Sequence, residues 1–81
     1  MRVIEEISFP ECKASIFYMN QKYIVKFEQG NLEQSYKIGE IDYIIKGIED
    51  IRVIVKESLY PNTISLFKHQ ADSLANAMKD Y

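Results

Sequence analysis

The stretch 13-KASIFYMNQKYIVKFEQGNLEQSYKI-38 decides the fold. It contains three runs rich in β-branched and aromatic residues, as β-strands are. These runs are Lys13–Met19, Lys22–Gln29 and Leu32–Ile38. Asn20-Gln21 and Gly30-Asn31 separate them; Asn tolerates a left-handed backbone, and Gly followed by Asn suits a type II′ hairpin turn. The stretch therefore predicts three antiparallel strands joined by two-residue turns.

Each of the two turns predicts a strand register independently, so the two predictions can be compared. Both registers place Tyr23, Val25 and Phe27 on one face of the middle strand with mostly apolar partners. A slip of one residue would mix the two faces, so this agreement favours a meander with one buried face. The predicted pairs are Tyr18–Tyr23, Ile16–Val25, Ala14–Phe27, Phe27–Gln34, Val25–Tyr36 and Tyr23–Ile38.

The opposite face is mostly polar but carries one apolar row. Val3–Phe9 reads as a further strand, and if it folds back around Pro10, Ile4 stands opposite Phe17. The same register points Glu5 toward the buried face, which counts against it. With Phe17 standing opposite Ile24, the predicted row is Ile4–Phe17–Ile24, with Met19 beside it.

The second half of the chain is predicted to be helical. Ile64, Phe67, Ala71, Leu74 and Met78 follow one another at intervals of three and four, which is one face of a helix. Pro61 suits the first turn, where its missing N–H costs nothing. We expect a helix over 60–80 that covers the inner sheet face along this stripe.

Residues 48–59 fit two interpretations. Ile48, Ile51, Val55 and Leu59 have helical spacing, whereas Ile51, Val53 and Val55 also alternate as in a strand. In the rival arrangement, 40–46 is a helix closed by Gly47, and 50–56 is a fifth strand. Periodicity alone leaves the two close to even.

The string VIEEI, then P-x-C-K, the hairpin segment KYIVK and FEQGNLEQSYKI resemble an uncharacterised family of small bacterial proteins. That resemblance implies a meander followed by an acidic linker and two helices, the second with Phe67 and Leu74 at the family's spacing. Residues 43–46 are more apolar than the resemblance leads us to expect. It favours a helix at 48–59 and implies no activity.

We therefore expect one α+β domain over 1–81. It comprises a four-stranded antiparallel meander (1–38), a linker (39–47) and two C-terminal helices (48–81) packed on one sheet face. The alternative is a ββββαβα chain with 50–56 as the fifth strand. Eighty-one residues leave no room for a second core.

Composition and charge exclude several function classes. Hydrophobic residues are 47% and charged residues 27%, so the chain is neither disordered nor of low complexity. A net charge of −2 gives no general attraction to nucleic acid or anionic membrane. The lone Cys12 predicts a reducing cytoplasm. Glu5 and Glu6 argue against a signal peptide, and no apolar run is long enough to span a membrane.

Candidate catalytic residues are few. His69 is the only histidine and Cys12 the only cysteine, and nothing in the spacing brings them together. We expect a surface histidine and a half-buried, inert thiol. Gly30, Gly39 and Gly47 belong to no phosphate-binding loop, and no metal-ligand or cofactor motif is present. The sequence predicts no enzyme, metal or cofactor.

The best hypothesis is a cytoplasmic interaction module that associates with itself as a homodimer or larger, although another protein partner is possible. Its candidate contact surface is Ile4, Phe17, Met19 and Ile24, because a contiguous exposed apolar patch marks interfaces. The alternative is weak binding of single-stranded nucleic acid through Lys22, Lys26, Lys37 and Phe17.

Overall fold

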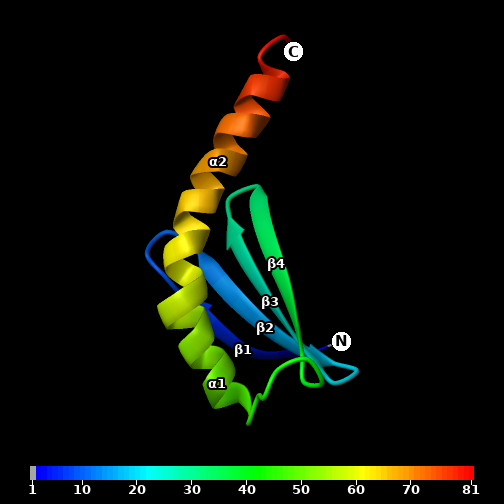
Figure 1. Ribbon diagram of the computed structural model, residues 1–81. Coiled ribbons are helices and arrows are strands. Elements are labelled where there is room, and N and C mark those ends of the chain that lie inside the picture. Colours follow the sequence, from blue (N-terminus) through cyan, green and yellow to red (C-terminus); the bar gives the residue numbers. More distant parts are fainter. Residues whose placement is uncertain (1) are drawn as a thin grey trace.

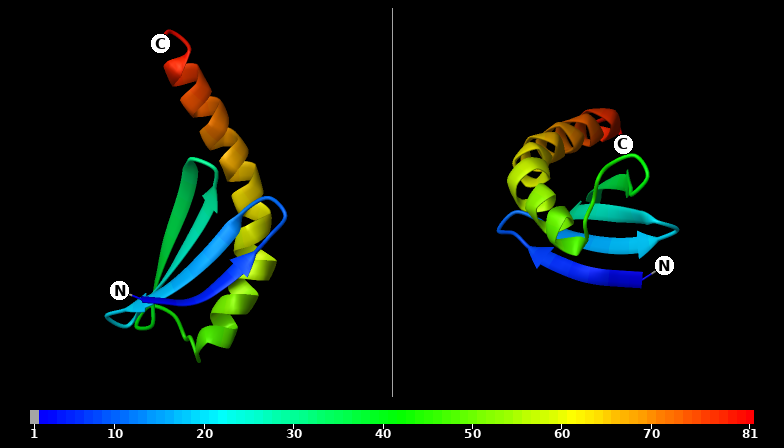
Figure 2. Two further views of the ribbon diagram at one scale, coloured as in Figure 1. Left: turned by 180° about the vertical axis from the view of Figure 1, so that it is seen from behind. Right: turned by 60° about the horizontal axis from the view of Figure 1, so that its bottom comes forward.

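The computed structural model describes residues 2–81 and has an α+β architecture in two layers. Four strands form an antiparallel sheet in chain order, and all helical residues lie on one of its faces (Figures 1 and 2). The predicted α+β meander is confirmed. The strands are β1 (Arg2–Ser8), β2 (Lys13–Met19), β3 (Lys22–Gln29) and β4 (Leu32–Gly39), and the helical segments are α1 (Ile48–Val53), the π-helical η1 (Ile54–Leu59) and α2 (Tyr60–Met78).

Both predicted turns are confirmed, and with them the register of β2, β3 and β4. Met19 faces Lys22, and Gln29 faces Leu32, so each connection has two residues. Asn20 and Gln21 both have positive φ, at 52° and 61°. Gly30 has φ +59°, the left-handed value that the first position of a type II′ turn requires and that glycine adopts at least cost.

The register of β1 differs from the prediction at its start. Val3, and not Ile4, faces Phe17, and the next pair is Glu5 with Ile16. Ile4 is therefore the extra residue of a β-bulge, which places two residues of one strand against one of its neighbour. From Glu5 onward the predicted register holds, and Glu5 points to the inner face.

The helical residues form one continuous rod, which corrects the prediction of two helices. Pro61 would crowd the carbonyl of Glu57 in an α-helix and has no N–H to donate. The chain meets this with a π turn before Pro61, in which the Tyr60 N–H bonds the Val55 carbonyl five residues earlier. The wider turn accommodates the ring without ending the helix.

The rival fifth strand over 50–56 is wrong, since these residues are helical. Ile51 and Val55, four residues apart, are both fully buried, as one helix face packed on the sheet requires. Residues 40–47 form a turn and an irregular loop, not a helix closed by Gly47.

The π turn also allows the residues before and after it to face the sheet on the same side of the rod. In an uninterrupted α-helix at about 100° per residue, Phe67 would lie about 160° around the axis from Ile51. Both side chains are nonetheless fully buried in the same core. Each residue of a π turn advances less around the axis, so η1 turns Phe67 back toward the sheet.

The core is a single apolar cluster between the sheet and the rod. From the sheet it takes Ala14, Ile16, Tyr23, Val25 and Phe27, from the loop before β2 Cys12, and from the rod Ile51, Val55 and Phe67. At the open loop between β1 and β2, Tyr60 stacks on Phe9 with ring centroids 3.9 Å apart. The strand residues of this cluster lie on the sheet face that the sequence predicts to be buried.

The far end of α2 extends beyond the sheet (Figure 1 and Figure 2, left). Ile64 and Phe67 pack on the core as expected, but Ala71, Leu74 and Met78 are exposed. The expectation that the whole stripe covers the sheet is therefore wrong, because the strands end before the helix does. The projecting turns contribute to a molecule of 47 × 24 × 21 Å.

Thr63 offers a test of this packing. Its side chain is fully buried, and within residues 2–81 its Oγ1 has no hydrogen-bond partner. Thr63→Val keeps the shape and removes an unsatisfied hydroxyl, so we expect the free energy of unfolding to rise by about 1 kcal/mol. Urea denaturation measures this. Thr63→Ser, which keeps the hydroxyl and removes the methyl group, should lower stability; a gain for Thr63→Ser and none for Thr63→Val would contradict the argument.

Candidate functional site

The predicted apolar row lies on the outer sheet face but is partly covered. Phe17 and Ile24 are half-buried, while Val3, Ile4 and Met19 are 44%, 43% and 40% exposed. The ammonium of Lys26 lies 5.7 Å from the centre of the Phe17 ring, a cation–π distance. The row is therefore Val3–Phe17–Ile24, and a charged side chain already occupies its middle.

The lysines of this face are interleaved with carboxylates. Lys26 Nζ is 3.5 Å from Glu33 Oε2, and Lys13 Nζ is 3.4 Å from Glu6 Oε2. Lys22 and Lys37 are exposed near one end of the face. The four residues proposed for nucleic acid, Lys22, Lys26, Lys37 and Phe17, thus share the outer face, with Lys26 paired to an acid.

Cys12 and His69 lie in different environments. Cys12 belongs to the core, and burial raises the pKa of its thiol, with the nearby Glu11 carboxylate adding to the effect. His69 is exposed on α2 and lines a cavity of which Cys12 is not part. The structure does not bring the two together as a nucleophile and a base.

A metal centre and a membrane-spanning helix are two further classes of site. In the part of the chain that the structure describes, no group of three or more His, Cys, Asp or Glu side chains is placed to hold a metal ion. Over the same residues, no helix combines the length and the apolarity needed to cross a bilayer.

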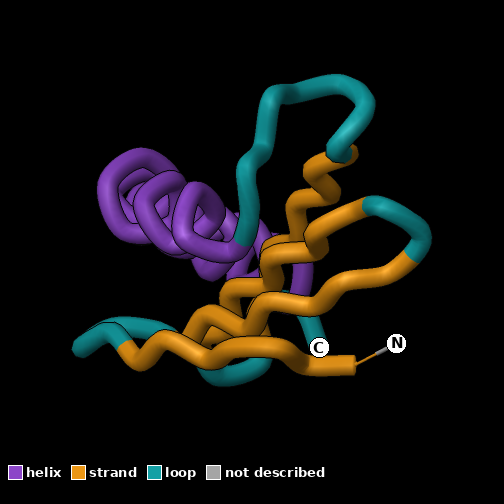
Figure 3. Tube along the Cα trace, turned by 90° about the horizontal axis from the view of Figure 1, so that it is seen from below, coloured by secondary structure: helices purple, strands orange, loops and turns teal. Residues whose placement is uncertain are grey.

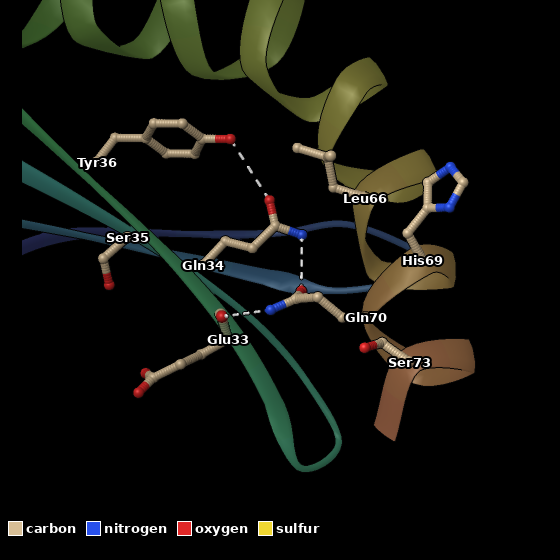
Figure 4. A pocket seen from close by; sticks show the side chains of 8 residues that line it. All are labelled: Glu33, Gln34, Ser35, Tyr36, Leu66, His69, Gln70 and Ser73. Atoms are coloured by element: carbon tan, nitrogen blue, oxygen red, sulfur yellow. Dashed lines mark hydrogen bonds between the residues drawn. The ribbon is translucent and has the colours of Figure 1, made fainter. Parts of the chain in front are cut away.

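A wedge opens between the edge strand β4 and α2, which we call the β4–α2 wedge. Its cavity of about 520 Å³ is lined by Glu33, Gln34, Ser35, Tyr36, Leu66, His69, Gln70 and Ser73 (Figure 4). Gln34 and Gln70 span it. Gln34 Nε2 donates to Gln70 Oε1 at 3.1 Å, and Gln70 Nε2 donates to the Glu33 carbonyl at 3.2 Å. Gln34 is a polar residue on the otherwise mostly apolar inner face of β4.

The 40–47 loop presents the most exposed apolar side chains near the sheet. Ile41 and Ile44 are 86% and 92% exposed, and Tyr43 is 60% exposed. The loop arches away from the end of β4 before it reaches α1 (Figure 3). The unusually apolar residues 43–46 were the sequence signal for it.

Both ends of this loop are fixed by hydrogen bonds. The Gly39 carbonyl accepts from the Asp42 and Tyr43 N–H groups at 3.2 and 3.3 Å. At the other end, the Lys46 N–H donates to Asp50 Oδ2 at 2.9 Å. The Tyr18 hydroxyl bonds the Glu40 carboxylate, which raises the pKa of Tyr18. The exposed isoleucines are therefore held outward by an anchored backbone.

Glu5, whose inward direction seemed unfavourable in the sequence, meets Arg52 of α1. Arg52 Nε and Nη2 donate to the two Glu5 oxygens at 2.5 Å each, a bidentate pair. The Glu5 side chain is 21% exposed and that of Arg52 40%. The hydrogen bonds from Arg52 lower the pKa of Glu5. The pair fastens the edge strand β1 to the rod and has a structural role.

Comparisons of the chain with models of protein families, with curated proteins and with solved structures gave no match.

The Glu5–Arg52 pair predicts an acid-sensitive contribution to stability. Because the folded state lowers the pKa of Glu5 below its ordinary 4.5, the contribution is complete above the unfolded pKa and is lost as pH falls through the folded one. Glu5→Gln should therefore be less stable than wild type at about pH 7, and the difference should shrink at about pH 3.

Urea denaturation at the two pH values measures this difference. Glu6→Gln is the matched control, because Glu6 pairs with Lys13 on the exposed outer face, where both side chains are about half exposed. A Glu5→Gln deficit that is equal at both pH values would contradict the assignment.

Proposed function

We propose that this chain is a small, non-enzymatic, cytoplasmic interaction module that associates with itself. The observation that carries the proposal is the 40–47 loop, which holds Ile41 and Ile44 almost fully in solvent. Anchored apolar side chains at such exposure are costly for a lone domain and are typical of a contact surface.

Two further features support an interaction role. The stripe of α2 that packs on the sheet continues past it, leaving Leu74 and Met78 about half exposed. A projecting helical segment this short has little stability of its own in water, so a partner against it would be stabilising. The outer sheet face ranks below the loop as a contact surface, because Phe17 and Ile24 are half-buried.

Nucleic-acid binding has less support. A base stacking on Phe17 would have to displace the Lys26 ammonium from the ring, and Lys26 also pairs with Glu33. Lys22 and Lys37 remain as candidate phosphate contacts, which is few for tight electrostatic binding.

Light scattering over a hundredfold range of concentration tests self-association. We expect wild type to form a dimer or larger assembly, and Ile44→Glu to weaken it by about tenfold or more, since a charge replaces an apolar contact. Ser58→Glu adds the same charge at an exposed position of the rod and serves as the control.

Phe17→Glu distinguishes the surfaces. If that variant alone gives a folded monomer, the contact lies on the outer sheet face and not at the loop. A wild-type chain that stays monomeric at every concentration would overturn self-association.

A further inference from the structure

We propose that two copies of this chain pair antiparallel through β4, so that their two sheets become one continuous sheet about a two-fold axis at Ser35. The inference rests on the proposed self-association and names the surface that performs it. It follows from the state of the two sheet edges, the direction of the β4 backbone groups and the charges along β4.

The two edges of the sheet are not equivalent. β1 carries a bulge at Ile4, and bulges are one of the devices that keep edge strands from pairing with other chains. β4 is paired with β3 in unbroken register from Leu32 to Gly39 and bears no bulge. The regular edge is therefore the one open to another strand.

The backbone of β4 directs hydrogen-bonding groups toward that edge. Of these, the Glu33 carbonyl already accepts from Gln70 and keeps its second lone pair. In a hairpin with a two-residue loop, the residues flanking the turn, here Gln29 and Leu32, form a hydrogen-bonded pair. Hydrogen-bonded and non-hydrogen-bonded pairs alternate along an antiparallel hairpin. The N–H and C=O groups of Glu33, Ser35 and Lys37 therefore point away from β3. The Glu33 carbonyl agrees with this, since it accepts from the side-chain amide of Gln70 on α2 (Figure 4).

The side chains of β4 are complementary to themselves about Ser35. With Ser35 facing the partner's Ser35, Glu33 faces the partner's Lys37, and the reverse pair forms by symmetry. On the inner face, Leu32 faces the partner's Ile38. Opposite charges and apolar pairs directly across antiparallel strands are stabilising. A register centred on Glu33 or on Lys37 would instead set like charges opposite each other.

The same symmetry places the loop and the wedge near each other. The two-fold axis is perpendicular to the sheet, so both rods stay on one face. Because the partner's Ile38 lies opposite Leu32, the loop that follows it approaches the hairpin end of the first copy, where the β4–α2 wedge lies. The exposed Tyr43 and Ile44 of each copy would then meet a cavity lined in part by Tyr36 and Leu66 of the other.

The first experiment is a charge swap read by the dissociation constant in analytical ultracentrifugation. Lys37→Glu and Glu33→Lys should each weaken the dimer by about tenfold, because both symmetric pairs become repulsive, and the double variant should recover most of the loss. Lys22→Glu is the control, since it makes the same change on the outer face of β3, one strand in from the proposed pairing edge. Far-UV circular dichroism confirms that each variant is folded.

The second experiment is a crosslink that does not depend on charge. Hydrogen-bonded antiparallel partners have Cα atoms about 5.5 Å apart, within disulfide range. In a Cys12→Ala background, Ser35→Cys should form a covalent dimer on mild oxidation, whereas Ser58→Cys on the rod should not. Wild-type dimers in which neither the charge variants nor Ser35→Cys has an effect would overturn β4 pairing and leave self-association standing. A monomeric wild type would overturn both.

Discussion

The contact between the inner sheet face and the helical rod governs the rest of this structure. A four-stranded sheet with one apolar face is stable only if another layer covers that face. Val25 and Phe27 on β3 are fully buried, and they share one core cluster with Val55 and Phe67 of the rod. A single rod crossing the sheet cannot cover every corner of it, so the wedge beside β4 and the projecting end of α2 both arise from this one layer.

Two sets of polar contacts, called clamps here, then determine the direction in which the rod crosses the sheet. Arg52 ties the beginning of the rod to Glu5 on β1, and Gln34 on β4 reaches the Thr63 carbonyl at 3.3 Å as well as Gln70. The two clamps lie at opposite edges of the sheet. Apolar burial supplies most of the stabilisation but has no direction, whereas these bidentate and amide contacts favour one crossing angle over its neighbours.

The sequence predicts the sheet well because the determinants of the sheet are local. Period-two alternation and the residues at 20–21 and 30–31 determine the strand pairs from β2 to β4. The bulge at Ile4 has no comparable local signal, and the inward direction of Glu5 becomes favourable only through Arg52, which is distant in sequence. The predicted division into two helices before Pro61 is wrong for a similar reason, since the π turn of η1 accommodates the proline ring and lets the helix continue.

The features of the candidate site also divide into those that local sequence predicts and those that depend on tertiary structure. Register alone places Phe17, Ile24 and the lysines on one face, and the apolar residues 43–46 hint at an exposed loop. The wedge could not be predicted, because Gln34 and Gln70 meet only in the tertiary structure. Helical spacing identifies the stripe ending at Met78 but does not reveal that the strands stop short of it.

The π turn has a consequence for how this chain can change over time. The two halves of the rod share one buried face only because the residues of η1 advance less around the helix axis than α-helical residues do. Deleting or inserting one residue between Ile51 and Phe67 would rotate everything after it by about 100°, turning Phe67 and the projecting end of α2 away from their present directions. Substitutions along the exposed side of this segment leave that phase intact. Related chains should therefore vary in composition here while keeping its length.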